Sequence, residues 1–136
     1  MTSQPFVSQP PVRFRDLDAF GHVNNAVHAS YIEEARVAYF EEVVGVDLAA
    51  VGTVVASLSI DYHRPIELGD ELAVETRVSE IGTTSLTLAH DLRVGGEVVS
   101  TASVVLVGYD YAADEPVAVP DAWRSAITDF EGRETE

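Results

Sequence analysis

The hydrophobic pattern changes its period once along the chain, and this change constrains the fold more than any other feature. One segment has apolar residues at helical spacing, which predicts a helix over about residues 26–44. Beyond Gly45, a favourable helix stop, apolar and polar residues alternate with the period of half-buried β-strands. The pattern therefore predicts one long helix followed by a run of strands. The expected buried stripe of the helix is Tyr31, Ile32, Ala35, Tyr39 and Val43.

Four strands are predicted in this second part, joined by short turns. They cover about residues 54–63, 72–78, 86–92 and 98–109. The turns fall at Gly69-Asp70, at Gly82-Thr83-Thr84 and at Gly95-Gly96, and the last of these is a strong two-residue hairpin signal. The final strand is apolar on both faces, which predicts a central position in the sheet or an interface.

The two ends of the chain complete the expected architecture. We expect a loose lead-in over residues 1–10, a short strand near Val12 to Arg15, a short helix over residues 121–130 and a frayed tail over residues 131–136. A length of 136 residues predicts a single domain. Five strands and one long helix are most economically combined as an α+β fold in which a curved antiparallel sheet wraps around the helix.

The loop before the helix carries most of the chemical information. Residues 16–25 contain two aspartates, a glycine, a histidine and two asparagines, and either asparagine could cap the helix. The first N–H groups of a helix, at the positive end of its dipole, can hold a developing oxyanion. A neighbouring carboxylate can act as a base or a nucleophile. These two parts suffice for acyl transfer without serine or cysteine.

Two motifs in the chain resemble a known family. Asp16-x-Asp18-x-x-Gly21-His22-Val23-Asn24-Asn25, followed by Glu34-x-Arg36, is similar to the 4-hydroxybenzoyl-CoA thioesterase-like branch of the hotdog-fold acyl-CoA thioesterases. Ile60-Asp61-Tyr62-His63-Arg64-Pro65 and the turn after it resemble the second strand and turn of that family. The resemblance runs from about Pro11 to Tyr109. It implies a hotdog fold, hydrolysis of an acyl-CoA or acyl-carrier-protein thioester, and a homodimer or homotetramer.

The resemblance places the family's catalytic carboxylate at Asp18, which would attack the thioester or activate a water; otherwise Asp18 makes only a turn hydrogen bond. Asp16 is its rival, because a spacing of two puts both side chains on one side of an extended segment and would raise the pKa of one carboxyl. We expect Asp16 to brace the loop. The backbone N–H of Asn25 is the candidate oxyanion donor, and an ordinary helix cap is the alternative.

Other residues of the two motifs are candidates for substrate binding. Gly21 would let the loop approach the thioester, or would serve only as a turn residue. Asn24 stands beside the helix start. His22 would orient the thioester or help in proton transfer, and a backbone-bonded loop histidine is equally plausible. His28, where an aromatic residue is usual in the family, would line the acyl pocket.

His63 and Arg64 precede Pro65, which bends the chain out of the strand. Arg64 would then meet a CoA phosphate, or would pair with Asp61 or Glu67. His90 alternates with leucines and is expected to be a buried, hydrogen-bonded histidine of the core.

Composition limits the remaining choices. The absence of cysteine excludes disulfides and thiolate chemistry. A net charge of -15, with 23 acids and 8 basic residues, disfavours nucleic acid and also opposes the phosphates of CoA. No apolar run is long enough to cross a bilayer, and the first residues do not resemble a signal peptide. We therefore expect a cytoplasmic protein that has no membrane partner. The histidine spacing predicts no metal, and no motif predicts an organic cofactor.

Three functions stay open at this point. The leading hypothesis is a thioesterase that acts through Asp18 and the helix N-terminus. A hydratase or dehydratase would keep the fold and change the reaction. A non-catalytic acyl-CoA-binding module would have no need for a carboxylate beside the thioester.

Overall fold

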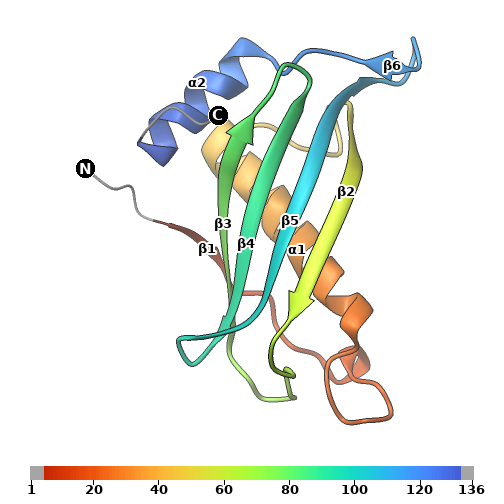
Figure 1. Cartoon of the computed structure of the whole chain (residues 1–136), viewed down its shortest axis with the longest axis vertical. Coiled ribbons are helices and arrows are strands. Elements are labelled where there is room, and N and C mark those ends of the chain that lie inside the picture. Colours follow the sequence, from red (N-terminus) through yellow and green to blue (C-terminus); the bar gives the residue numbers. More distant parts are fainter. Residues whose placement is uncertain (1–4, 133–136) are drawn as a thin grey trace.

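The computed structural model describes residues 5–132 as a curved antiparallel sheet with a long helix across its concave face (Figure 1). The strand order is β1-β3-β4-β5-β2, and a short β6 pairs with the end of β5. This confirms the predicted five-stranded sheet around one helix. The strands are β1 (Phe6–Ser8), β2 (Thr53–Tyr62), β3 (Leu72–Ile81), β4 (Ser85–Val94), β5 (Glu97–Asp110) and β6 (Glu115–Pro116); the helices are α1 (Asn25–Tyr39) and α2 (Asp121–Glu131).

Local sequence signals set both ends of the long helix. Asn24 is the N-cap, and its side-chain oxygen accepts a hydrogen bond of 2.8 Å from the N–H of Ala26. At its other end α1 runs into a π-helical turn, η2 (Phe40–Val44). The helix then stops at Gly45, whose φ of +83° suits glycine. The predicted helix and its stop are confirmed, although Val43 is only half-buried.

The core between α1 and the sheet is apolar at both ends and contains a few polar side chains. One cluster surrounds Tyr31 and Ile32, and the other surrounds Tyr39 and Phe40 and includes Trp123 of α2. His90 is buried and its Nδ1 lies 3.0 Å from Thr76 Oγ1, which confirms the core histidine predicted from the sequence. The other buried polar side chains are His28, Arg36, Thr76 and Ser100.

The expectations for the N-terminal part were wrong within the described residues. The supposed lead-in contains β1, whose Phe6 is buried and lies opposite Thr76 of β3. The strand expected near residues 12–15 is instead a 3-10 turn, η1 (Phe14–Asp16). The Asp16 carboxylate accepts the N–H of Arg13 at 2.9 Å, and this local bond competes with an extended backbone. Residues 1–4 lie outside the described part.

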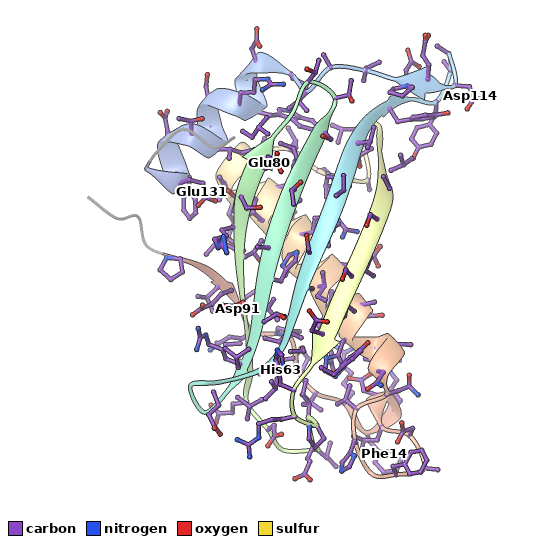
Figure 2. The ribbon with its side chains drawn as sticks, in the orientation of Figure 1. Phe14, His63, Glu80, Asp91, Asp114 and Glu131 are labelled. Atoms are coloured by element: carbon purple, nitrogen blue, oxygen red, sulfur yellow. The ribbon has the colours of Figure 1, made fainter. Side chains whose placement is uncertain are left out.

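The C-terminal expectation was wrong at Glu131. This residue ends α2, and its carboxylate accepts hydrogen bonds from the Tyr39 hydroxyl at 2.6 Å and from the Val78 N–H at 3.0 Å. Figure 2 shows Glu131 beside β3, far along the sheet from His63. The α2 helix is therefore tied to both α1 and β3, and residues 133–136 lie outside the described part.

The helix covers the sheet unevenly. It packs most closely against β3, so that β2, at the other edge, has its concave face largely uncovered. Leu58 lies opposite the fully buried Val104 and shares its face, yet 43% of Leu58 is exposed. The strand predicted to be half-buried is thus mostly exposed. In contrast, β5 lies between β4 and β2, which confirms the central position predicted from its apolar faces.

Candidate active site

A cleft of about 410 Å³ opens where β2 ends and α1 begins. The loop before α1 and the segment after β2 meet there, at the lower end of the molecule in Figure 1. Seven of the eight predicted site residues line the cleft, and only Gly21 does not. The lining residues are Asp18, Phe20, His22, Val23, Asn24, Asn25, His28, Tyr62, His63, Arg64 and Pro65.

The Asp18 side chain is held by its own turn. Asp18 Oδ1 accepts the N–H of Phe20 at 2.9 Å, so the turn hydrogen bond considered from the sequence is present. Gly21, with φ of +82°, closes the turn by donating its N–H to the Asp18 carbonyl at 3.0 Å. Within residues 5–132, the other carboxylate oxygen, Oδ2, has only a long contact of 3.5 Å to the Asn24 side-chain amide. One oxygen is therefore held by the turn, and the other is only weakly engaged on a side chain that lines the cleft.

The start of α1 presents a backbone donor to the same cleft. The N–H of Ala26 is taken by the Asn24 side chain, and the N–H of Val27 by the Asn24 carbonyl. The N–H of Asn25 has no hydrogen-bond acceptor among residues 5–132. Because Asn24 provides the cap, the Asn25 N–H keeps its donor capacity at the positive end of the helix dipole. A backbone donor at this position is chemically able to stabilise an oxyanion.

The Asp16 carboxylate is engaged in two hydrogen bonds. Its Oδ2 accepts the Tyr31 hydroxyl at 2.7 Å as well as the N–H of Arg13. Partial burial alone would raise the pKa of Asp16, but these two hydrogen bonds and the nearby arginine charges hold the pKa below its ordinary value. A raised pKa, the reason for considering Asp16 as a base, is therefore not found. Asp16 instead links the loop to α1.

We expect this link to make stability depend on pH. The folded-state pKa of Asp16 is lowered, so its contribution is fully present above the unfolded pKa of about 3.8 and is lost as the pH falls through the folded value. Denaturant unfolding at a series of pH values should show this loss in the wild type. Asp16→Asn should have a lower midpoint at neutral pH and a flatter dependence below about pH 4. Parallel curves for the two proteins would contradict this prediction.

His28 and Tyr62 form the inner wall of the cleft. His28 is buried, its Nδ1 lies 3.0 Å from Ser100 Oγ, and burial lowers its pKa, so the ring is neutral near pH 7. Its ring meets the Tyr62 ring edge-on at a centroid distance of 4.9 Å, and the Tyr62 hydroxyl donates to the Asn25 carbonyl at 2.7 Å. Tyr62 was missed as a site residue, although its place directly before His63-Arg64-Pro65 was a usable signal.

The remaining candidates lie at the outer rim. His22 Nε2 is 3.9 Å from Glu67 Oε2, and the side chain is partly exposed. His63 and Arg64 are exposed, and both backbone N–H groups bond to the Val99 carbonyl. The Arg64 guanidinium pairs with Glu97, not with Asp61 or Glu67 as considered from the sequence. Glu97 begins β5 and is distant in sequence, so no local pattern indicated it.

Within residues 5–132, no three His, Asp or Glu side chains are grouped closely enough to hold a metal ion. In that same part of the chain, no helix has both the length and the apolar character needed to cross a membrane.

Known proteins with similar sequence and structure agree with this fold. The thioesterase-like superfamily matches residues 12–127. The uncharacterized Bacillus subtilis protein YsmA is 36% identical, covering 93% of this chain and 87% of its own. Acyl-CoA thioesterase YbgC of Haemophilus influenzae is 32% identical over 86% of this chain and 91% of its own length. A Thermus thermophilus thioesterase, solved with coenzyme A and zinc, has a TM-score of 0.86 and 42% identity. The match covers 93% of this chain and 94% of that protein.

The curved sheet around one helix, with a carboxylate beside the helix start, defines a thioesterase of the hotdog fold. The chain belongs to the thioesterase-like superfamily.

Proposed function

We propose that the protein is an acyl-CoA thioesterase that hydrolyses a thioester to a carboxylic acid and coenzyme A. The observation that carries this proposal is that one cleft is lined by Asp18 and by Asn25, whose N–H has no acceptor within residues 5–132. The named thioesterase relatives support it, and the coenzyme A in the Thermus structure supports this choice of thiol. A cytoplasmic location is part of the proposal, since CoA thioesters are made and consumed there.

In this mechanism Asp18 either attacks the thioester carbonyl or takes a proton from a water that attacks it. The carbonyl oxygen becomes an oxyanion that accepts the Asn25 N–H. The carbon–sulfur bond then breaks, and the thiolate leaves and is protonated. If water was the nucleophile, the acid is released directly. If Asp18 was the nucleophile, a mixed anhydride remains on its carboxylate, and a water hydrolyses it to release the acid and restore Asp18. His22 also lines the cleft and is our candidate for returning the proton. Gly21 has an indirect role: its N–H donates to the Asp18 carbonyl and stabilises the turn that positions Asp18.

The coenzyme A part of the substrate is expected at the outer rim of the cleft. His63 and Arg64 line the cleft and are exposed. We assign the thioester to the part of the cleft lined by Asn24, which caps α1, and by the buried His28. Arg64 must exchange its Glu97 partner for a phosphate, an exchange that costs little because surface ion pairs are weak.

The decisive experiment is hydrolysis of a panel of acyl-CoAs with detection of the released thiol. Saturable thiol release that depends on Asp18 would support the thioesterase. Conversion of an enoyl or hydroxyacyl thioester without thiol release would favour the hydratase or dehydratase. Tight binding with neither reaction would favour the acyl-CoA-binding module. Acyl-carrier-protein substrates in the same assay separate the two carriers.

We propose that the protein is a homodimer, with a tetramer of two dimers as the further possibility. The support is β2: it is a long edge strand, and its concave face carries the exposed side chains of Val55, Leu58 and Tyr62. An open apolar edge of this kind calls for a partner strand. A second copy could pair along β2 and cover this face, close to the cleft.

Sedimentation at micromolar concentration, with enough salt to screen the negative charge, should give at least twice the mass of 14.7 kDa. Leu58→Glu should raise the dimer dissociation constant on the order of a hundredfold, because it buries a charge at the interface. Leu68→Glu is the matched control, since Leu68 is 52% exposed in a loop outside β2. A stable wild-type monomer, or equal effects of the two variants, would contradict the β2 dimer.

A further inference from the structure

His28, on the inner wall of the cleft, forms a buried pair with Ser100 of β5. The two residues are 1% and 0% exposed, and His28 Nδ1 lies 3.0 Å from Ser100 Oγ. Within residues 5–132, the Ser100 hydroxyl has no other hydrogen-bond partner. The mechanism proposed above uses neither this hydroxyl nor the ring nitrogens of His28.

The hydrogen bond in this pair determines which ring nitrogen carries the proton. Burial lowers the pKa of His28, so the ring is neutral near pH 7 and has a single N–H. If Nδ1 carried that proton and donated it to Ser100, the buried hydroxyl hydrogen would have no acceptor among the described residues. Buried donors are normally paired. The Ser100 hydroxyl therefore donates to Nδ1, and the His28 proton is on Nε2.

The Nε2 atom of His28 is open to a partner. It makes no hydrogen bond to any residue in the described part of the chain. It is also not among the fully enclosed unpaired atoms, whereas Nε2 of His90 is. Part of its surface is therefore accessible. Because His28 lines the cleft and is otherwise buried, this surface belongs to the cleft, which gains a neutral N–H donor.

The His28 ring and the Asn25 backbone lie close together at the first turn of α1. The two residues are three positions apart, a spacing at which helical residues share a face. Helical side chains also lean toward the helix start, which brings the ring toward Asn25. Tyr62 connects the two positions: its ring meets the His28 ring at 4.9 Å, and its hydroxyl donates to the Asn25 carbonyl at 2.7 Å.

We propose that the Nε2–H of His28 is a second donor to the oxyanion, beside the Asn25 N–H, and that Ser100 keeps the ring in the tautomer that this requires. The inference rests on the proposed thioesterase function. A thioester carbonyl accepts such a bond weakly, and accepts it more strongly once its oxygen carries negative charge. The bond therefore stabilises the transition state more than the bound substrate. His28 is then a catalytic residue, and Ser100 is a positioning residue.

The kinetic test compares His28→Phe with His28→Gln in thiol release from acyl-CoA. Phenylalanine keeps a ring beside Tyr62 but has no donor, so it should lower kcat by about a hundredfold and leave KM within a few-fold. Glutamine carries an amide N–H at a similar distance from the backbone and should recover about tenfold of this loss. An unchanged kcat in His28→Phe, or an effect on KM alone, would overturn the proposal.

Ser100→Ala tests the positioning role. It should lower kcat by about threefold to tenfold in the wild type and should have no further effect in His28→Phe, since the hydroxyl acts only through the ring. Thr76→Val is the matched control. Thr76 Oγ1 lies at the same distance of 3.0 Å from Nδ1 of His90, which does not line the cleft, so this variant should leave kcat unchanged. Equal effects of Ser100→Ala and Thr76→Val would overturn the role of Ser100.

Nitrogen NMR of the isotope-labelled wild type gives a readout that does not depend on activity. The protonated and unprotonated nitrogens of a neutral imidazole have well-separated shifts, and the His28 signals are those lost in His28→Phe, or in His28→Gln if the first variant does not fold. The proton should be on Nε2. A proton on Nδ1 would overturn the inference and leave the thioesterase function intact. Failure of the wild type to release thiol from any acyl-CoA would instead overturn the proposed function, and with it the oxyanion role, whichever nitrogen is protonated.

Discussion

Asp18→Asn should lower kcat for acyl-CoA hydrolysis by about a hundredfold or more, the usual effect of removing an acid–base group. The substitution keeps the size of the side chain and its Oδ1 acceptor, so the hydrogen bond from the Phe20 N–H should persist. It removes the negative charge of a side chain that lines the cleft. Substrate affinity should stay within a few-fold of the wild type, because the contacts proposed for coenzyme A are made by other residues, His63 and Arg64. Steady-state and single-turnover thiol release would measure both quantities.

The chain offers a matched control for this variant. Asp47 accepts the N–H of Ala49 at 2.9 Å, the same turn geometry that Asp18 has with Phe20, and it does not line the cleft. Asp47→Asn should leave kcat unchanged. Asp16→Asn should reduce stability more than turnover, since Asp16 accepts the Tyr31 hydroxyl. If Asp16→Asn abolished activity while Asp18→Asn retained it, the assignment within the pair would be reversed.

Tyr39→Ala should destabilise the fold by about 3–5 kcal/mol, because the Tyr39 side chain is fully buried where three elements meet. Its ring packs edge-on against Phe6 of β1 and Phe130 of α2, at centroid distances of 5.4 and 5.8 Å. Its hydroxyl donates to Glu131. Tyr39→Phe keeps the ring and should cost about 1–3 kcal/mol through the lost hydrogen bond to a charged acceptor. Denaturant unfolding would measure both variants.

Tyr109→Phe is the control for the lost hydroxyl. Tyr109 also donates to a carboxylate, that of Asp114, but this pair is exposed and should not change the unfolding midpoint measurably. If Tyr39→Phe also left the unfolding midpoint unchanged, the hydrogen bond between Tyr39 and Glu131 would not stabilise the position of α2. The prediction matters because both ends of the chain looked loose in the sequence.

Some of the site was accessible from local patterns alone. The spacing of Asp18, Asn24 and Asn25 ahead of a helical stripe indicated a carboxylate beside a helix start, and these residues do line one cleft. The sequence did not show which of Asn24 and Asn25 caps the helix and which offers its backbone N–H, because either asparagine can begin a helix. The structure assigns the cap to Asn24, and the N–H of Asn25 has no acceptor in the described part of the chain.

The sequence by itself determined the elements whose signals are local. These are the helix with its stop at Gly45, the Gly95-Gly96 hairpin and the alternation of the long strands, since period, caps and turns act over a few residues. Only the tertiary structure decided that β1 pairs with β3, that Arg64 meets Glu97 and that Glu131 holds Tyr39. It also decided that α1 lies over β3 and leaves β2 uncovered. These contacts join residues that are far apart in the chain, and pairing at that range has no local signature in one sequence.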